Sequence, residues 1–504
     1  MRHLRRILPL FSNKYSIVSA RSCQVRRYCD TSDKKKGDEF SLLKSNVNNK
    51  IEPNVLVPNP VERTLKSMGL MEKEEFDNID PDIPRFCDVV IIGGGVVGSS
   101  VAYWLKESVP DGLEVVVVEK DLTYSKASTT LSVGGIRQQF SIPENIQMSL
   151  FGAEFLRNAN RYLNCDDLLP PEIQFHPHGY LYLASEAGAE KLMENVTVQN
   201  DFGAKVALLT AGQLKSKFPW ISTEGVACGA YGLENEGWFD PWSLLSALRR
   251  KNHYLGTEYV EGEVVGVEDL HLGVNYSGQE IMESRAPRDL RIRTKDGKVY
   301  PLRFAVAVIC AGHASGEVAK MMGIGGGNGL FVVPVPVEPR KRYVYCVHSQ
   351  DGPGLDCPLV VDPSGVYFRR EGMAGHYLVG SSPEEHEEPP TDNLDVDDNF
   401  FQEKIWPKLA ERVPSFNSLK VKSAWAGHYD YNTYDQNAIL GPHPIHRNVF
   451  FATGFSGHGL QQAPAAGRAV AELIIHSRYQ TLDLTRFRFE RILYNDRLIE
   501  TNIV

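Results

Sequence analysis

The chain has 504 residues, of which 42% are hydrophobic and 23% are charged. This length exceeds one typical domain, and this composition excludes a fibrous or largely disordered protein. The formal net charge at pH 7 is −9, and it becomes −16 without the seven basic residues among the first 29. So acidic a body is not expected to bind nucleic acid.

The cysteines carry no metal-binding or disulfide pattern. Two of the eight, Cys23 and Cys29, fall within the first 29 residues, and the other six show no Cys-x-x-Cys or Cys/His spacing. The sequence therefore predicts neither a metal site nor a disulfide framework.

Residues 1–29 are rich in basic and hydroxyl side chains and contain no acidic residue before Asp30. This composition is typical of a mitochondrial transit peptide, whereas the short run around Pro9 lacks the apolar region of a secretory signal. We therefore expect a mitochondrial protein of the matrix or of the matrix face of the inner membrane.

Residues 30–85 are polar, contain several prolines and show little periodicity, which indicates a linker. The longest apolar stretch in the chain, 89–105, contains four glycines and does not have the composition of a membrane span. Any membrane association is expected to be peripheral.

The pattern changes abruptly at Phe86. An apolar strand is predicted at 87–92, a helix over the following residues to Leu105, and a β-branched strand at 115–118. Two more buried strands are predicted at 264–267 and 305–309, and a helix is predicted at 465–475.

Other segments alternate polar and apolar residues, as in 180–183 and 343–346, which predicts half-exposed antiparallel strands. The expected fold class is therefore α/β: a Rossmann-type FAD-binding domain interlocked with a mixed or antiparallel β-sheet domain that holds substrate. The predicted FAD-binding domain comprises residues 86–170, 236–330 and 421–480. The substrate or cap domain comprises 171–235 and 331–420, and 481–504 form a C-terminal tail.

The sequence Gly93-Gly94-Gly95-Val96-Val97-Gly98 follows the first strand and opens the first helix. Glycines at this position let the backbone approach a pyrophosphate, which the positive end of the helix attracts. Glu119 ends the second strand 21 residues after Gly98, the spacing of a carboxylate that accepts ribose hydroxyls. The motif predicts dinucleotide binding, with a merely tight strand-to-helix turn as the alternative.

A second glycine-rich loop, Gly454-Phe455-Ser456-Gly457-His458-Gly459, leads into the predicted last helix. Its helix N-terminus offers a site for a second anionic group, such as the reduced flavin pyrimidine. This second loop favours FAD over NAD.

These two glycine loops, Glu119, the segment 128–137 and Cys310-Ala311-Gly312 together resemble the D-amino-acid oxidase and sarcosine oxidase family over residues 86–476. The resemblance implies an FAD-dependent oxidoreductase. The cofactor-binding residues that it implies are Gly93, Gly95, Val97, Gly98, Glu119, Lys120, Thr129, Ser132, Val265, Gly312, Gly454, Gly457, His458 and Gly459.

Three segments, 134–140, 234–241 and 429–437, resemble most one mitochondrial branch of this family. That branch is needed for assembly of respiratory complex I. The resemblance therefore implies complex I subunits or assembly intermediates as partners.

Sarcosine oxidases hold the substrate carboxylate between an arginine and a lysine. Arg137 matches the arginine, whereas Gln461 stands at the lysine position and cannot supply charge. The catalytic candidates are Arg137, His458 and Gln461, with His458 as a proton donor or charge stabiliser. Two alternatives stay open: Arg137 paired with an acidic neighbour or the flavin phosphates, and His458 shaping its loop only.

Related mitochondrial dehydrogenases attach FAD through a histidine in the early loop, where this chain has Thr129-Thr130-Leu131. We therefore expect non-covalent FAD, with His428 as the one candidate for attachment. Arg340 and Arg342 share a face of a predicted strand, so one of them can reach the pocket; a solvated strand face is the alternative.

Two functions follow from the resemblance. The first is a role in complex I assembly with catalysis weak or dispensable. The second is oxidation of a secondary or tertiary amine, such as an N-methyl amino acid, in which the cofactor performs the chemistry and the protein supplies position and electrostatics.

Overall fold

Strand β1 (Phe86–Ile92), helix α2 (Val96–Ser108) and strand β2 (Val115–Glu119) follow one another, as the sequence predicts. The computed structural model describes residues 83–166, 168–271, 285–326 and 329–502, and all of them belong to the unit Glu75–Val504. The predicted transit peptide and residues 30–82 of the predicted linker lie outside the described residues.

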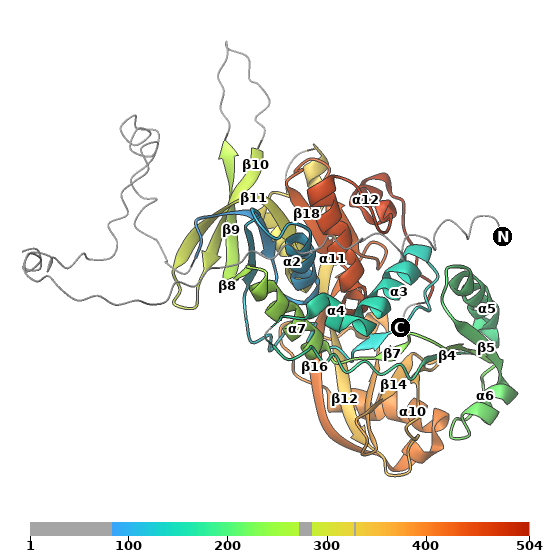
Figure 1. The fold of residues 1–504 in the computed structure, drawn as a ribbon. Coiled ribbons are helices and arrows are strands. Elements are labelled where there is room, and N and C mark those ends of the chain that lie inside the picture. Colours follow the sequence, from blue (N-terminus) through green and yellow to red (C-terminus); the bar gives the residue numbers. More distant parts are fainter. Residues whose placement is uncertain (1–82, 167, 272–284, 327–328, 503–504) are drawn as a thin grey trace, which may run out of the picture. The chain divides into compact units, whose positions relative to one another are not determined.

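The first sheet has eight strands among the described residues (Figure 1). Strands β1, β2, β8 (Glu258–Glu261) and β11 (Val299–Ile309) are parallel. The other members are β18 (Val449–Thr453), parallel to β11; β17 (Ile439–Pro442), antiparallel to β18; and the antiparallel strands β9 (Glu263–His271) and β10 (Arg285–Arg293).

Both faces of the central parallel strands are buried. Val89 and Ile91 of β1 belong to a core that includes helix α2, whereas Val90 and Ile92 belong to a second core on the opposite face. A strand buried on both faces carries a continuous apolar run rather than an alternating one. This is why β1 and β2 read as uninterrupted runs in the sequence.

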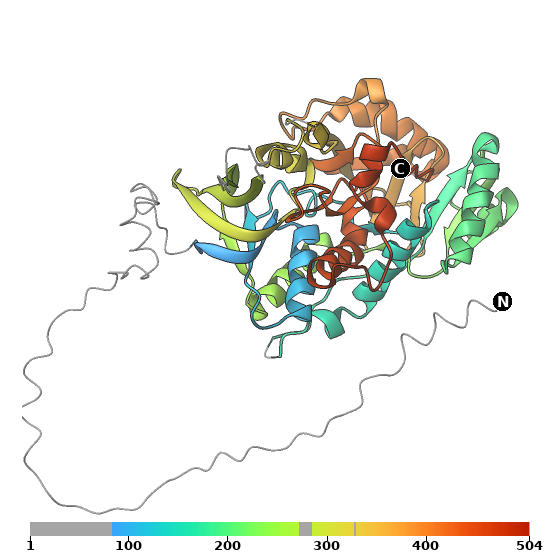
Figure 2. The same ribbon diagram turned by 90° about the horizontal axis from the view of Figure 1, so that it is seen from above.

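Helix α11 (Gly459–His476) packs directly against α2, which lies over one face of the first sheet. A Cβ on Gly467 would lie only 2.3 Å from the Ser100 hydroxyl oxygen, so this contact requires glycine. Trp104 Nε1 donates to the carbonyl of Pro464 at 2.8 Å. The two helices that open at the two glycine loops are thereby held side by side (Figure 2).

The second sheet is mixed. Its strands, in spatial order, are β16 (Lys420–Asn432), β12 (Val337–His348), β15 (His376–Ser381), β14 (Val366–Glu371), β13 (Leu359–Val361), β4 (Tyr180–Ala184), β6 (Cys228–Gly232) and β5 (Val206–Thr210). All neighbouring pairs are antiparallel except β13 and β4. A further short pair joins β3 (Gly135–Ile136) and β7 (Gly237–Trp238).

The remaining helical elements cover the sheets and connect them. The α-helices are α3 (Pro143–Arg157), α4 (Ala159–Leu163), α5 (Glu186–Asp201), α6 (Ala211–Lys217), α7 (Pro241–Tyr254), α8 (Ser315–Met321), α9 (Asp398–Phe400), α10 (Trp406–Arg412) and α12 (Glu490–Tyr494). Short 3₁₀ turns lie at Gly312–Ala314, Gly329–Val332, Glu385–Glu387, Pro414–Ser418 and Thr485–Phe487, and a π-helical turn lies at Phe401–Ile405.

The structure corrects three details of the sequence interpretation. Strand β16, assigned from position 421 to the FAD-binding domain, belongs to the second sheet, because it pairs with β12 along nearly its whole length. Strand β4 is buried on both faces rather than half-exposed. The predicted tail is packed against the body as far as the described residues extend, since Leu484, Phe487 and Asn502 are buried.

Candidate functional site

A cavity of about 850 Å³ is lined by residues of both sheets. The lining includes Glu119 and Glu263, residues at the start of α2 and of α11, and Arg137 and Tyr180. This volume lies in the range of ligand and cofactor pockets.

The glycines of the first loop have different structural roles. Gly93 has a φ of +103°, and a Cβ on it would lie 2.3 Å from the Cys310 carbonyl oxygen. A Cβ on Gly98 would lie 2.0 Å from the Gly93 carbonyl oxygen, whereas one on Gly95 would meet only the Thr129 hydroxyl at 3.3 Å. Gly93 and Gly95 line the cavity, whereas Gly98 permits the close packing of α2 against the loop.

Thr129, in a loop distant in sequence, hydrogen-bonds to the first turn of α2. The residue before the helix, Gly95, has no side chain to cap it, and the Val96 N–H donates instead to Thr129 Oγ1 at 3.1 Å. Val97, which follows Val96 on α2, and Ser132, in the loop that contains Thr129, also line the cavity. The positive end of the α2 dipole therefore lies at the cavity wall, where it favours an anionic group.

Glu119 lies at the end of β2 and lines the cavity. Its carboxylate accepts the Gly94 N–H at 2.7 Å and the Asp121 N–H at 3.0 Å. Burial raises the pKa of Glu119, and these backbone hydrogen bonds oppose the rise. The neighbouring Lys120 also lines the cavity, but it is exposed and its ammonium lies 2.6 Å from Glu263 Oε1.

Of the remaining residues predicted to hold cofactor, Gly312, Gly457, His458 and Gly459 line the cavity. Val265 does not, and its neighbour Val264 does, because successive side chains of β9 point to opposite faces. Gly454 does not line the cavity either. It has a φ of +73°, and a Cβ on it would lie 3.0 Å from Val337 Cγ2, so it serves the turn.

These residues fit FAD. A glycine loop in which Gly93 and Gly98 have no room for a Cβ opens a helix at one wall, and the half-buried carboxylate of Glu119 lies beside it to accept ribose hydroxyls. The start of α11 supplies a second helix N-terminus on the same cavity.

Arg137 is buried and lines the cavity. Its guanidinium donates to the Gln139 carbonyl, lies 3.1 Å from His458 Nε2, and stands over the ring of Phe140 at 4.2 Å. Within the described residues no carboxylate forms a direct ion pair with it, and the nearby Glu236 carboxyl acts on it through charge alone. A buried cation whose hydrogen-bonding partners are neutral favours an anionic ligand.

Gln461 holds the backbone of Arg137. Its Oε1 accepts the Arg137 N–H at 2.8 Å and lies 3.1 Å from the Ser149 hydroxyl, which donates its one hydrogen to the Arg137 carbonyl. The two residues predicted to clamp a carboxylate are therefore in contact, but the oxygen of the Gln461 carboxamide is used to position Arg137.

His458 does not fit the predicted role of proton donor. Burial, assisted by the charge of Arg137, lowers the pKa of His458 to about 3, so the ring is neutral at ordinary pH. A guanidinium can only donate, so the Nε2 that faces it must be the acceptor. His458 therefore orients Arg137.

Glu236 is a buried carboxyl next to this group. It accepts the Gln138 N–H at 2.6 Å and the Gln139 Nε2 at 2.7 Å. Burial raises the pKa of Glu236 to about 7, although these donors and the charge of Arg137 oppose the rise. Arg137 therefore has a nearby acid that changes charge near neutral pH.

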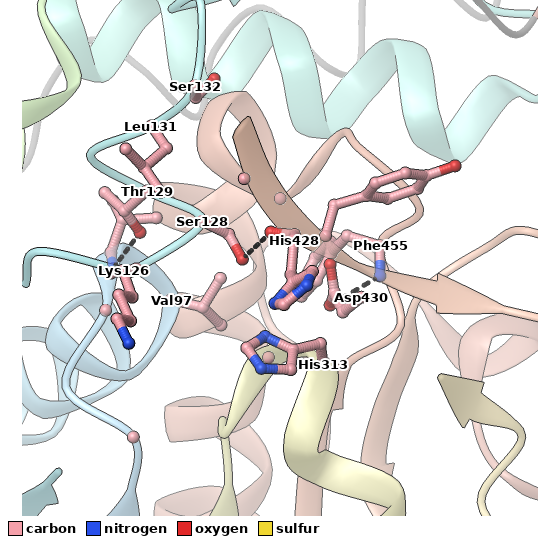
Figure 3. A pocket seen from close by; sticks show the side chains of 18 of the residues that line it. Val97, Lys126, Ser128, Thr129, Leu131, Ser132, His313, His428, Asp430 and Phe455 are labelled. Atoms are coloured by element: carbon pink, nitrogen blue, oxygen red, sulfur yellow. Dashed lines mark hydrogen bonds between the residues drawn. The ribbon is translucent and has the colours of Figure 1, made fainter. Parts of the chain in front are cut away.

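His428, the candidate for covalent attachment, lines the cavity, and the structure adds lining residues that the sequence analysis did not select. The first is His313, whose ring centroid lies 4.9 Å from that of His428, and burial lowers the pKa of His313 to about 4 (Figure 3). Asp430 accepts the Phe455 N–H at 3.0 Å, and burial raises its pKa to about 6. Ser128, beside the selected Thr129, donates to the His428 carbonyl at 2.5 Å, and the hydroxyl-rich run 128–132 was the signal for this wall.

Of the two arginines predicted to share a strand face, Arg342 lines the cavity. It forms two hydrogen bonds of 2.8 Å with Glu388 and one of 2.9 Å with the Tyr429 hydroxyl. Its charge is therefore already balanced, unlike that of Arg137.

No helix in the described ranges is long and apolar enough to cross a membrane. Within the same ranges, no group of three or more His, Cys, Asp or Glu side chains is placed to hold a metal ion.

Comparison with known proteins identifies the family. Residues 88–473 match the family described as FAD dependent oxidoreductase. The chain is 54% identical over 426 residues to FAD-dependent oxidoreductase domain-containing protein 1 of Xenopus laevis, covering 84% of this chain and 85% of that protein. The homolog of that protein in Drosophila melanogaster is 43% identical over 456 residues, covering 89% and 87%.

Among solved structures, L-proline dehydrogenase from P. horikoshii superimposes with a TM-score of 0.67. The alignment covers 82% of this chain and all of that one at 24% identity, a likeness that concerns the fold. The chain therefore belongs to the family of FAD dependent oxidoreductases, whose cofactor is FAD.

Proposed function

We propose that the cavity is the active site of an oxidoreductase whose substrate is a small amine with a carboxylate, such as an N-methyl amino acid. The observation that carries this proposal is Arg137, a guanidinium with 2% exposure that lines the cavity and has neutral hydrogen-bonding partners. A buried charge of this kind is stabilised when a ligand of opposite charge binds.

Around that carboxylate, each residue has a separate task. Arg137 binds the substrate carboxylate, and the His458 and Gln139 acceptors fix the direction of the guanidinium. The rings of Phe140 and Tyr182, at 4.2 and 5.2 Å from the guanidinium carbon, exclude water and so strengthen the attraction. Bound FAD supplies the acceptor for a hydride from the carbon beside nitrogen.

Reduction of the protein-bound flavin tests this proposal. Sarcosine, dimethylglycine and proline are added anaerobically to the purified flavin-loaded protein, and flavin absorbance is followed. We expect bleaching by at least one of them, loss of that bleaching in Arg137→Met, and partial recovery in Arg137→Lys. Flavin content measured in each variant separates loss of substrate binding from loss of cofactor. Unchanged bleaching in a flavin-loaded Arg137→Met protein would refute the proposed role of Arg137.

As a second candidate function, we propose a mitochondrial flavoprotein needed for assembly of respiratory complex I, in which turnover is weak. The acid-free basic residues 1–29 and the resemblance of segments 134–140, 234–241 and 429–437 support it. The use of Gln461 to hold backbone, where a second cation would strengthen substrate binding, also favours low turnover. The FAD of either candidate is proposed to be non-covalent.

Complementation separates the two candidates. Cells that lack the protein receive wild type or Arg137→Met, and import into mitochondria and the amount of complex I are measured. Restoration of complex I by both forms supports an assembly role without turnover. Restoration by wild type alone ties the role to catalysis, and a wild type that is not imported would contradict the proposed location.

A further inference from the structure

Residues 498–502, close to the end of the described chain, contact residues that neighbour Arg137. Asn502 Nδ2 donates to the Gln139 carbonyl at 2.6 Å. The same carbonyl accepts the Arg137 guanidinium. Asn502 thus contacts the group that fixes the direction of the guanidinium without touching the guanidinium itself.

Glu500 secures the helix beside this carbonyl. Its carboxylate accepts the Ser141 N–H at 2.7 Å, the Ile142 N–H at 3.2 Å and the Asn145 side-chain amide at 3.1 Å. Helix α3 begins there, and the residue before it, Ile142, has no side chain that can cap it. A carboxylate at a helix N-terminus satisfies its free N–H groups and complements its dipole.

Helix α3 connects Glu500, at its start, to the backbone of Arg137. Ser149, on α3, donates its hydroxyl hydrogen to the Arg137 carbonyl, and the same hydroxyl lies 3.1 Å from the Gln461 carboxamide oxygen. Residues 498–502 are therefore connected to Arg137 by two routes, one through the Gln139 carbonyl and one through α3.

In the segment 498–502, the residues on both sides of the exposed Ile499 are buried and hydrogen-bonded. Leu498 is buried; its N–H donates to Asp435 Oδ2 at 3.2 Å, and its carbonyl accepts Asn437 Nδ2 at 2.8 Å. Glu500 and Asn502 are 4% and 8% exposed, whereas Ile499, between Leu498 and Glu500, is 67% exposed. Buried polar side chains in this arrangement serve specific partners, and Ile499 offers an internal control.

We propose that Asn502 and Glu500 are positioning residues that hold Arg137 in the geometry required to bind the substrate carboxylate. The proposal rests on the proposed function of Arg137. A guanidinium recognises a carboxylate through directional N–H groups, so a small rotation weakens recognition of the anion. In the described part of the chain, residues 498–502 form no hydrogen bond with either glycine loop, so the flavin-binding backbone does not depend directly on this segment.

The test compares a carboxylate with its neutral amide. Full-length, flavin-loaded wild type, Asn502→Leu, Asn502→Asp and Ile499→Ala are titrated with methylthioacetate and with methylthioacetamide, and the flavin spectrum is followed. Loss of one hydrogen bond is expected to weaken methylthioacetate binding about three- to tenfold in both Asn502 variants. Flavin content and binding of the amide should stay unchanged, and Ile499→Ala should behave as wild type.

The outcomes distinguish two failures. A wild type that shows no response to methylthioacetate means that the cavity is not a carboxylate site, and the proposed function fails. A wild type that responds, together with Asn502 variants that respond equally, overturns only the positioning role. Equal weakening of both ligands, or loss of flavin in both Asn502 variants, would show that the segment supports the fold and not Arg137.

Discussion

Replacement of Gln461 by lysine, glutamate or leucine examines why the second basic residue is absent. Gln461 Oε1 accepts the Arg137 N–H at 2.8 Å and lies 3.1 Å from the Ser149 hydroxyl, and both Arg137 and Gln461 are buried. Lysine cannot accept the Arg137 hydrogen bond. Glutamate keeps it and places a negative charge beside the guanidinium.

The magnitudes follow from these contacts. A buried N–H left without an acceptor costs about 1 to 3 kcal/mol, and a buried ammonium without a partner costs about 3 kcal/mol more. Gln461→Lys should therefore lower the free energy of unfolding by about 4 kcal/mol or more, and Gln461→Leu by about 1 to 3 kcal/mol. Gln461→Glu should fold normally and bind an anion about tenfold more weakly or worse, because its carboxylate competes for Arg137.

Denaturant unfolding of the flavin-loaded variants, followed by titration of the folded ones with methylthioacetate, measures both effects. We expect no gain of carboxylate affinity in Gln461→Lys. A Gln461→Lys protein as stable as wild type that binds methylthioacetate more tightly would refute the reasoning. It would show that the side chain at position 461 can leave the Arg137 backbone and reach the ligand.

Three further predictions concern the cofactor and pH. Gly98→Ala should lose flavin, because its Cβ would lie 2.0 Å from the Gly93 carbonyl oxygen. Gly95→Ala should keep the native fold, since its Cβ meets only a hydroxyl at 3.3 Å. A Gly98→Ala protein that stays yellow would contradict the expected loss of flavin. Glu119→Ala should weaken FAD binding by about 1 to 3 kcal/mol in titrations of apoprotein, and an unchanged affinity would assign the ribose to another residue. Methylthioacetate binding should tighten as the pH falls through about 7, because protonation of Glu236 removes a negative charge near Arg137, whereas His458, with a pKa of about 3, stays neutral. Glu236→Gln should abolish that pH dependence, and a dependence that persists would point to another group.

Local sequence determined the nucleotide-binding half of the fold. The apolar run of β1, the glycines from Gly93 to Gly98 and the carboxylate at Glu119 depend on periodicity and short spacing, which neighbouring residues specify without help from the rest of the chain. The resemblance to the family rested on the same local motifs. Strand β4 shows the limit of such patterns: its alternating tyrosines and leucines suggest one exposed face, yet each set packs into a separate buried core.

Tertiary structure decided which side chains meet. Gln461 reaches the Arg137 backbone across 324 positions, and Asn502 reaches the Gln139 carbonyl across 363. The division of work between Gly95 and Gly98 likewise depends on which atoms lie within reach of each Cβ. Spacing along the chain cannot report these contacts, because a buried polar group takes its partner from whichever element packs against it. The sequence by itself therefore determined that this protein is built to hold FAD, and the packing of α3, α11 and residues 498–502 decided how its buried arginine is held.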